Sequence, residues 1–395
     1  MRIAIVNDYS MQHIGGAVVS MLEQKKALEK AGHTVIVLQL GKKPARPTYD
    51  ESGFIYIKST ITMPASLYNL PILFAGKKDD ELITRILNEH EIEAVHLQSE
   101  MTLAHLVAKN AQQLSIPIFF TVHTFFWEYN STFAINPITF LSKKLFEKAF
   151  RVTIEDLQPT GNAYEKLLKN ITLSIAARSK VVISPSKHQQ KALQSTKLKT
   201  PVVVVPNPFE TDNSTATFIE STPHTIRFTW IGRVVPEKRP LEFLEAAANA
   251  HKQSNVQFEV VVIGDGSILE EAQATFALPN VTYLGKLTHE ETIAQIDESD
   301  MVCMSSYHFD NQPMIIAEAV SRFRPVFYCD EQLTEGVDVA GYRTEDETVA
   351  AMTKGIIDLI EHPQKIVVLS KKAEAAAALF APKTFVKSVT KLYQE

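Results

Sequence analysis

The sequence predicts an α/β protein in which two Rossmann-like, doubly wound domains face each other across a cleft. Its 395 residues exceed the length that a single hydrophobic core usually serves. Short apolar runs alternate with helical patterns, as in βαβ units, and the alternation restarts after a polar, Thr/Ser-rich stretch at 211–224. We therefore expect an N-terminal domain over 1–205, a C-terminal domain over 206–380, and a final helix over 381–395 that could cross back to the N-terminal domain.

The first half opens with a strand over 2–6, an unbroken apolar run typical of parallel sheets that helices cover on both faces. Apolar residues at helical spacing follow over 17–31 and stop at Gly32, a good C-terminal cap. Residues 125–180 break the alternation with long helical patterns, clustered aromatics and lysines. The other expected elements are strands near 34–39, 54–57, 94–97, 117–122 and 202–205, and helices near 79–89 and 101–114.

The second half repeats the same alternation, which predicts a second parallel sheet. Strands are expected near 225–231, 257–263, 281–284, 301–304 and 325–328. Helices are expected between them near 240–253, 266–275, 289–296 and 313–323, and three more close the chain near 346–361, 366–379 and 383–394.

Composition excludes several classes of function. Forty basic and 45 acidic residues give a net charge of −5, which provides no field for a polyanion, so we expect no nucleic-acid partner. Cys303 and Cys329 both lie in apolar runs, which indicates reduced structural thiols. The first apolar run turns polar at Asn7, too early for a signal peptide, and no later run approaches the ~18 apolar residues of a membrane span. We expect a cytoplasmic protein, at most peripheral at the inner face of the membrane, while its oligomeric state is left open.

Glycines follow two expected strands, at the carboxyl ends where open parallel sheets bind ligands. Gly15 and Gly16 lie between the first strand and its helix, and Gly264 and Gly266 follow the strand over 257–263. Without a Cβ, such residues let backbone N–H groups approach a phosphate, although each motif alone is also a common turn signal. The dinucleotide fingerprint G-x-G-x-x-G and the P-loop are absent, which argues against an NAD- or FAD-dependent enzyme.

Two cations, Arg233 and Lys238, stand between the first strand and first helix of the second half. A pair of this kind suits a diphosphate. The competing interpretation is surface ion pairing with Glu237 or Glu242, which is the usual role of Arg and Lys.

The stretch 305–319 joins a buried strand to a helix, with Pro313 in the first helical turn. The helix start offers free N–H groups to a phosphate, and Asp310 and Glu318 can accept hydrogen bonds from sugar hydroxyls. Asp310 could instead cap the helix, and Glu318 could be a solvated helix residue. Apolar neighbours on both sides of Glu318 favour a buried carboxylate, which requires partners.

His123 follows the apolar strand ending at Val122 and therefore also lies at a carboxyl end. A histidine there could hydrogen-bond a sugar hydroxyl. A lone histidine beside aromatic residues is more often structural, but the position of His123 favours a functional role.

Taken in order and spacing, these motifs resemble the retaining glycosyltransferases of family 4, which have the two-domain GT-B fold. The resemblance spans nearly the whole chain. It rests on the glycine loop 15–16, Ala-Gly-His-Thr-Val at 31–35, His123-Thr124, Pro185-Ser186, Pro206-Asn207-Pro208, Gly232-Arg233 with Lys238, Gly264-Asp265-Gly266, and Asp310 with Glu318.

The resemblance implies transfer of a hexose from a nucleoside diphosphate sugar, with UDP-glucose as the favoured donor. It implies no cofactor, and the absence of a D-x-D sequence predicts no required metal. The resemblance implies that the donor diphosphate contacts Gly16, Arg233 and Lys238. It also implies that the transferred sugar contacts His123 and Asp310, and that the ribose contacts Glu318. The catalytic candidates are thus His123, Asp310, Arg233 and Lys238, and the other donor-binding candidates are Gly15, Gly16, Gly264, Asn311, Gln312, Pro313, Met314 and Glu318.

The sequence also departs from the family pattern. Asp310 replaces the first Glu of the E-x7-E motif, Gln312 replaces the glycine before the proline, and Arg324 stands where the family commonly has glycine. The shorter Asp310 side chain bears directly on the sugar contacts.

Within the family, three segments look similar to glycolipid synthases that glucosylate diacylglycerol: Gly-Gly-Ala-Val-Val-Ser-Met, the run from Pro64 to Pro71, and His-Thr-Phe-Phe-Trp-Glu-Tyr. This implies a lipid acceptor, with Phe126, Glu128 and Tyr129 as acceptor-binding candidates. The Phe/Lys-rich segment 138–150 could lie on an anionic membrane, although an amphipathic helix packed on its own domain is the commoner explanation. The alternatives are a soluble glycan or protein hydroxyl as acceptor, a cytosolic nucleotide-sugar-binding protein without transfer activity, and a related enzyme such as an epimerase or a phosphorolytic enzyme.

Overall fold

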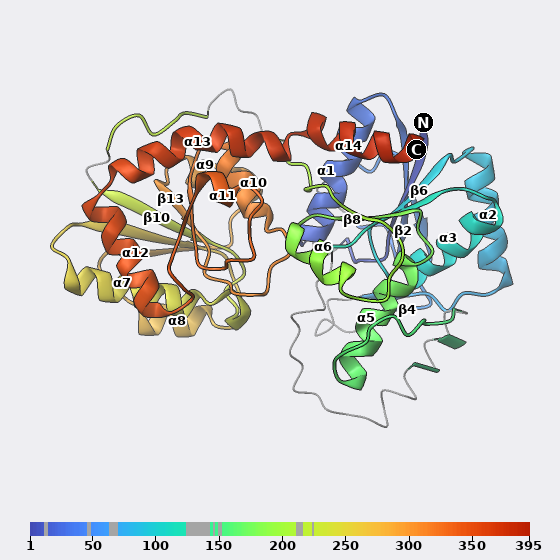
Figure 1. Cartoon of the computed structure of the whole chain (residues 1–395), viewed down its shortest axis with the longest axis horizontal. Coiled ribbons are helices and arrows are strands. Elements are labelled where there is room, and N and C mark those ends of the chain that lie inside the picture. Colours follow the sequence, from blue (N-terminus) through green and yellow to red (C-terminus); the bar gives the residue numbers. More distant parts are fainter. Residues whose placement is uncertain are drawn as a thin grey trace. The chain divides into compact units, whose positions relative to one another are not determined.

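The computed structural model confirms the predicted α/β class and contains two parallel sheets with helices on both faces (Figure 1). Its contacts divide the chain into two compact units: unit 1 comprises Met1–Pro208 with Pro382–Glu395, and unit 2 comprises Phe209–Ala381. The structure describes residues 1–11, 15–45, 49–62, 70–123, 143–144, 147–148, 152–210, 216–222 and 225–395.

Unit 1 contains a seven-stranded parallel sheet with the order β3-β2-β1-β6-β7-β8-β9. β1 pairs with both β2 and β6, so the direction of winding reverses beside it, and ligands of doubly wound sheets bind at such a switch point. The strands are β1 (Arg2–Asn7), β2 (Thr34–Leu40), β3 (Phe54–Ile57), β6 (Ala94–Leu97), β7 (Ile118–Thr121), β8 (Val181–Ser184) and β9 (Val202–Val204).

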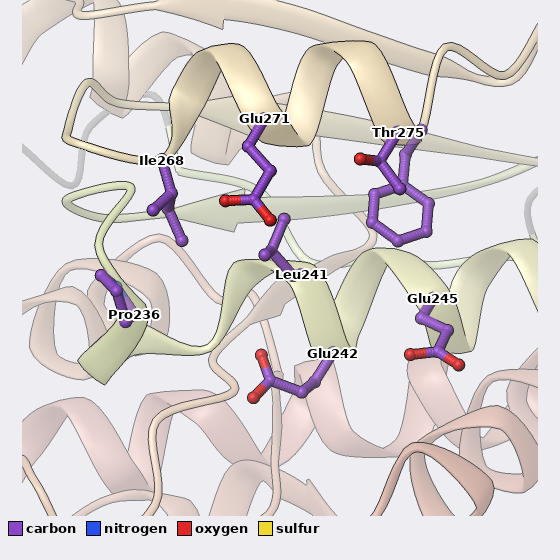
Figure 2. Close-up of a pocket in the computed structure, with 8 residues that line it drawn as sticks. Pro236, Leu241, Glu242, Glu245, Ile268, Glu271 and Thr275 are labelled. Atoms are coloured by element: carbon purple, nitrogen blue, oxygen red, sulfur yellow. The ribbon is translucent and has the colours of Figure 1, made fainter.

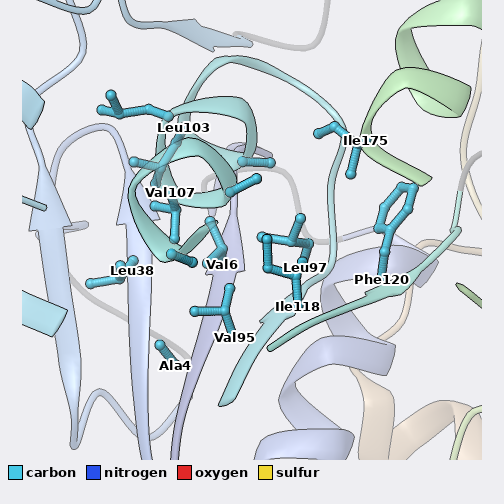
Figure 3. Close-up of a cluster of buried hydrophobic side chains, with 14 of the residues drawn as sticks. Ala4, Val6, Leu38, Val95, Leu97, Leu103, Val107, Ile118, Phe120 and Ile175 are labelled. Atoms are coloured by element: carbon cyan, nitrogen blue, oxygen red, sulfur yellow. The ribbon is translucent and has the colours of Figure 1, made fainter. Parts of the chain in front are cut away.

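Helices cover both faces of this sheet, and apolar side chains from sheet and helices form its cores. On one face, Val6 and Leu97 pack with Leu103 and Val107 of α3 and with Ile175 of α5 (Figure 3). The helices are α1 (Gly16–Lys30), α2 (Lys77–Glu89), α3 (Thr102–Gln113), α5 (Ala163–Ala176), α6 (Lys187–Gln194) and α14 (Pro382–Gln394), and a two-stranded antiparallel sheet pairs β4 (Ile61–Thr62) with β5 (Pro71–Ile72).

The C-terminal helix α14 belongs to unit 1, and it packs beside α1 (Figure 1). Phe385, Val389 and Tyr393 from α14 are buried in the second core of this unit. The Tyr393 ring lies 4.8 Å from that of Phe119, centroid to centroid, and its hydroxyl lies 2.7 Å from His96 Nδ1. The last helix therefore completes a core that begins with β1.

Unit 2 contains a six-stranded parallel sheet with the order β12-β11-β10-β13-β14-β15. β10 pairs with β11 on one side and β13 on the other, which places the switch point of this unit between β10 and β13. The strands are β10 (Ile226–Ile231), β11 (Phe258–Ile263), β12 (Val281–Gly285), β13 (Met301–Cys303), β14 (Val326–Tyr328) and β15 (Gly341–Arg343). The helices are α7 (Pro240–Gln253), α8 (Leu269–Thr275), α9 (His289–Asp297), α10 (Met314–Ser321), α11 (Val337–Ala340), α12 (Val349–Glu361) and α13 (Gln364–Phe380).

Element boundaries differ from the sequence predictions by a few residues. α8 begins at Leu269 rather than near 266, because Gly266 lies in a tight backbone contact with Val234. α10 begins at Met314, with Pro313 in the N-cap position, and ends at Ser321, just before Phe323 adopts a positive φ of 58°. Across the described residues, no helix is both long and apolar enough to cross a membrane.

Candidate active site

Two loops meet at the switch point of unit 2, one after β10 and the other after β13. The first carries Arg233 and Lys238, and the second begins with Ser305. Trp230 donates from Nε1 to Ser305 Oγ at 2.9 Å, and Ser305 Oγ donates to the carbonyl oxygen of Lys238 at 2.8 Å. These bonds fix the backbone of Lys238 against the strand end of β13.

Lys238 and Asp310 form a close ion pair between Nζ and Oδ1. Ser306 Oγ donates to the other carboxylate oxygen at 2.6 Å, and Lys238 Nζ lies 5.3 Å from the centroid of the Phe309 ring. The two paired side chains are only 20% and 12% exposed. The carboxylate thus holds an ammonium group at the switch point rather than capping α10.

The fold itself requires glycine in the loop after β11, which lies next to the loop after β10. Gly264 has a φ of +138°, and a Cβ there would lie 1.8 Å from the carbonyl oxygen of Gly232. A Cβ at Gly266 would lie 2.2 Å from the carbonyl oxygen of Val234. Val234 N in turn donates to Asp265 O at 3.0 Å, so the loops after β10 and β11 run in direct backbone contact.

The remaining donor candidates of unit 2 surround the start of α10. Asn311, Gln312 and Met314 are half-buried and Pro313 is buried, while Arg233 is exposed in the loop after β10. The prediction of a buried Glu318 is wrong, because this residue is half-buried. The buried stripe of α10 is formed instead by Ile316, Ala317, Ala319 and Val320.

Gly15 and Gly16 differ from Gly264. Gly15 is the N-cap of α1 with an extended backbone, and Gly16 is the first helical residue. Among the described residues, a Cβ added at either glycine would meet no atom within 4 Å. Packing among the described residues therefore does not explain why glycine stands at these two positions. A ligand that approaches the backbone closely would explain it.

The switch point of unit 1 contains a buried carboxylate that the sequence did not single out. Asp8 accepts hydrogen bonds from Ser99 Oγ at 2.7 Å and from the backbone N–H groups of Leu103 at 2.6 Å and Ala104 at 3.1 Å. Burial raises the pKa of Asp8 above its ordinary value, although these hydrogen bonds oppose the shift. Asp8 therefore joins the end of β1 to the first turn of α3.

His123 follows β7 and lies 2.5 Å from Gln98, measured from Nε2 to Oε1. Desolvation lowers the pKa of His123 to about 4, so its imidazole is neutral near pH 7. A neutral imidazole has one donor and one acceptor nitrogen, both suited to hydroxyl groups. The acceptor candidates Phe126, Glu128 and Tyr129 lie outside the described residues.

Comparisons with known proteins agree with this arrangement. Residues 14–213 match the family model described as Glycosyltransferase Family 4, and residues 225–362 match the one described as Glycosyl transferases group 1. The chain belongs to glycosyltransferase family 4. It is therefore a glycosyltransferase, as the motif order predicted.

The similar proteins cover nearly the whole chain of this family 4 glycosyltransferase. An alpha-monoglucosyldiacylglycerol synthase from Acholeplasma laidlawii is 22% identical over 416 residues, covering 100% of this chain and 96% of the relative. A protein of the same name from Streptococcus pneumoniae is 22% identical over 382 residues, covering 92% and 80%. The crystal structure of Anabaena Alr3699/HepE in complex with UDP aligns with a TM-score of 0.68 and 16% identity over 100% of both chains. At that identity the likeness shows the fold, which is GT-B.

Two other features of this glycosyltransferase are poorly suited to bind the donor diphosphate. A pocket of about 410 Å³ between α7 and α8 is lined by Glu242, Glu245 and Glu271, whose charge would repel phosphate (Figure 2). Within the described residues, possible metal-ligating atoms of His308, Asp330 and Glu331 lie within 4.8 Å of one another. These groups already bind protein atoms: His308 N donates to Asp330 at 2.8 Å, and His308 Nε2 lies 2.9 Å from Glu331.

Acid should destabilise unit 1 through its buried histidines. Burial lowers the pKa values of His96 and His105 to about 3, whereas an unfolded histidine titrates near 6.5. The unfolded chain binds the extra protons, so their contribution to stability is complete above pH 6.5 and is lost as the pH falls toward 3. Between these two pKa values, each histidine should add about 1.4 kcal/mol per pH unit to the slope of the unfolding free energy against pH. Urea unfolding followed by circular dichroism between pH 6.5 and 4 measures this slope.

A single substitution assigns the effect. His105→Gln should lower the dependence of the unfolding free energy on pH by the contribution of about one proton. A dependence equal to that of the wild type would contradict the assignment.

Proposed function

We propose that this glycosyltransferase transfers glucose from UDP-glucose to a hydroxyl of diacylglycerol or another membrane lipid, with retention of anomeric configuration and without a metal ion. The Lys238–Asp310 pair at the switch point of unit 2 carries the donor half of the proposal. The two relatives named alpha-monoglucosyldiacylglycerol synthase support the sugar and the acceptor.

The diphosphate is the first group to account for, because negative charge develops on it as the glycosidic bond breaks. Lys238 lies in a position fixed by Ser305 and Asp310, so its ammonium group does not have to reorganise during the reaction. The exposed Arg233 on the same loop and the first turn of α10 add further positive potential. Together they would stabilise the departing UDP.

The sugar contacts follow from the chemistry of the remaining candidates. Asp310 can accept hydrogen bonds from sugar hydroxyls while it orients Lys238, and the neutral His123 can bind a further hydroxyl. The half-buried Glu318 suits the ribose hydroxyls. Retention would arise from attack on the face that the phosphate leaves, with the phosphate accepting the proton of the acceptor hydroxyl, so no enzymic nucleophile is invoked.

An exposed apolar surface on unit 1 supports peripheral attachment to an anionic bilayer at the inner face of the membrane. Along β5 and the residues after it, Pro71 and Leu73 are buried while Phe74 is 46% exposed, and Ile61 on β4 is 44% exposed. Three exposed lysines flank these apolar side chains in the sequence: Lys58, Lys77 and Lys78. Apolar side chains edged by lysine are suited to the interface of an anionic membrane.

The decisive experiment identifies the product. The protein is incubated with UDP-glucose and diacylglycerol in mixed vesicles, and the lipid fraction is analysed for a glucolipid by mass spectrometry and for α-configuration by NMR. Parallel reactions contain EDTA, GDP-mannose as an alternative donor, or a soluble glycan as an alternative acceptor. Glucolipid formation that persists with EDTA is expected. UDP release only with the soluble glycan would overturn the lipid acceptor, and donor binding without turnover would overturn transfer itself.

A further inference from the structure

A hydrogen-bonded path of buried amide side chains in unit 1 begins at His123. Gln98 after β6, Gln24 on α1 and Asn207 after β9 are 1%, 0% and 4% exposed. His123 Nε2 contacts Gln98 Oε1 at 2.5 Å, Gln98 Nε2 donates to Gln24 Oε1 at 2.8 Å, and Gln24 Nε2 donates to Asn207 Oδ1 at 3.1 Å. Side chains from four separate segments thus form one continuous hydrogen-bonded path.

All hydrogen bonds along this path run in one direction. Each glutamine donates through its nitrogen and accepts through its oxygen, and Gln24 Nε2 makes a second bond to Ser20 Oγ at 3.2 Å. Because the oxygen of Gln98 can only accept, the proton in its contact with His123 resides on Nε2. A neutral imidazole carries one proton, so Nδ1 of His123 is left as an acceptor.

The far end of the path lies where the chain leaves the unit. Asn207 is flanked by Pro206 and Pro208, whose rings restrict the backbone on either side, and unit 2 begins at Phe209. A buried amide must be hydrogen-bonded to offset its desolvation, and apolar side chains would fill the same space without that requirement. The presence of several linked buried amides here therefore indicates a requirement beyond packing.

We propose that Gln98 and Gln24 are positioning residues that hold the His123 imidazole as the Nε2–H tautomer, with Nδ1 available to accept a hydrogen bond from a donor-sugar hydroxyl. Asn207 anchors this path at the segment that leads into unit 2. The inference rests on the proposed function, in which His123 contacts the transferred sugar.

Among the residues that the structure describes, the surroundings of His123 add little competing charge. Across the sheet, the titratable neighbour on β6 is His96, which burial keeps neutral with a pKa of about 3. On β8, the other neighbouring strand, the sheet ends in Ile183 and Ser184, which do not titrate. At the adjoining strand ends, Asp8 is bound by Ser99 and α3, and Glu100 accepts a hydrogen bond from the Tyr9 hydroxyl. A charge placed at position 98 would therefore act directly on the imidazole.

Two substitutions of Gln98 separate positioning from packing. Gln98→Met removes the acceptor and should lower kcat about 10- to 100-fold, with KM for UDP-glucose changed less than about threefold, as for other residues that orient a functional histidine. Gln98→Glu preserves the acceptor but favours the imidazolium ion, so it should raise the pKa of His123. This variant should be active near pH 8.5 and lose activity toward pH 6, where the wild type stays level.

Gln39→Glu is the matched control. Gln39 is 1% exposed in the same unit and bonds Asn7 at 2.7 Å and the carbonyl oxygen of Tyr9 at 2.9 Å, outside the path to His123. Its pH profile should match that of the wild type. Gln24→Met should also lower kcat, but by less than Gln98→Met does. In the double variant the two effects on kcat should be less than additive, because both changes break the same hydrogen-bonded path.

Nitrogen NMR of the His123 imidazole tests which tautomer is present, independently of turnover. The wild type should show a protonated Nε2 and an unprotonated Nδ1 on His123, and Gln98→Glu should raise the pH at which Nδ1 gains its proton. The opposite tautomer, or an unshifted titration in Gln98→Glu, would overturn the positioning role even if glucose transfer is confirmed. Absence of transfer in the wild type would overturn the proposed function alone, because the NMR result would still test the path.

Discussion

Replacing Lys238 with alanine should lower kcat/KM for UDP-glucose at least about 100-fold while the protein stays folded. A preorganised cation of this type contributes about 3 kcal/mol to stabilising developing charge, and each 1.4 kcal/mol corresponds to about tenfold in rate. The substitution also leaves the Asp310 carboxylate, now without its cation, beside the position proposed for the phosphate. Steady-state release of UDP, measured with a coupled assay, gives the effect.

Lys252→Ala is a suitable control, because Lys252 is an exposed lysine at the end of α7 in the same unit. It should retain wild-type activity, and circular dichroism should show the same fold in both variants. Arg233→Ala should give a smaller loss than Lys238→Ala, because Arg233 is exposed to solvent. Full activity in both Arg233→Ala and Lys238→Ala would refute the diphosphate assignment.

Gly264→Ala should destabilise unit 2 by about 3 to 5 kcal/mol, which combines backbone strain with overpacking. The φ of +138° disfavours any residue with a side chain, and the new Cβ would lie 1.8 Å from the carbonyl oxygen of Gly232. Relief of this contact must move the loop that carries Arg233 and Lys238, so affinity for UDP should fall as well. Urea unfolding monitored by fluorescence follows unit 2 through the buried Trp230 in β10, provided that Trp127, the second tryptophan of the sequence, is replaced by phenylalanine in every variant compared.

Gly285→Ala provides the comparison for this prediction. Gly285 also has a positive φ, of 67°, but among the described residues its added Cβ would meet no atom within 4 Å. Its cost should be limited to backbone strain, about 1 kcal/mol. If the two variants unfolded at the same urea concentration, the close contact between the loops after β10 and β11 would not be a source of stability.

Much of the fold could be predicted because buried parallel strands leave a simple signal. β10, β11 and α7 lie within one residue of their predicted ranges, since mostly apolar runs followed by glycine mark the two strands and Pro240 marks the start of the helix. The elements α11 and β15 were missed because Val-Asp-Val-Ala and Gly-Tyr-Arg are short and contain no continuous apolar run. The small sheet of β4 and β5 was missed because each of its strands has only two residues.

The candidate site was only partly predictable. Lys238 and Asp310 were found by their positions after strands, but their ion pair depends on which strands are neighbours in the sheet. Gln98 and Gln24 were missed because a glutamine has no distinctive sequence signal and their contact joins residues 74 positions apart. The burial of Glu318 was overestimated because apolar neighbours along the chain do not determine which side of a helix faces the core.

The position of α14 has a consequence for synthesis of the chain on the ribosome. The first unit to emerge is the last to be completed, because the core around β1 and β7 awaits Phe385, Val389 and Tyr393. The whole of Phe209–Ala381 is made in between and contains its own core. A nascent chain that stalls before residue 382 would therefore expose the apolar surface that includes Ile5 and Phe119, which makes it a substrate for chaperones.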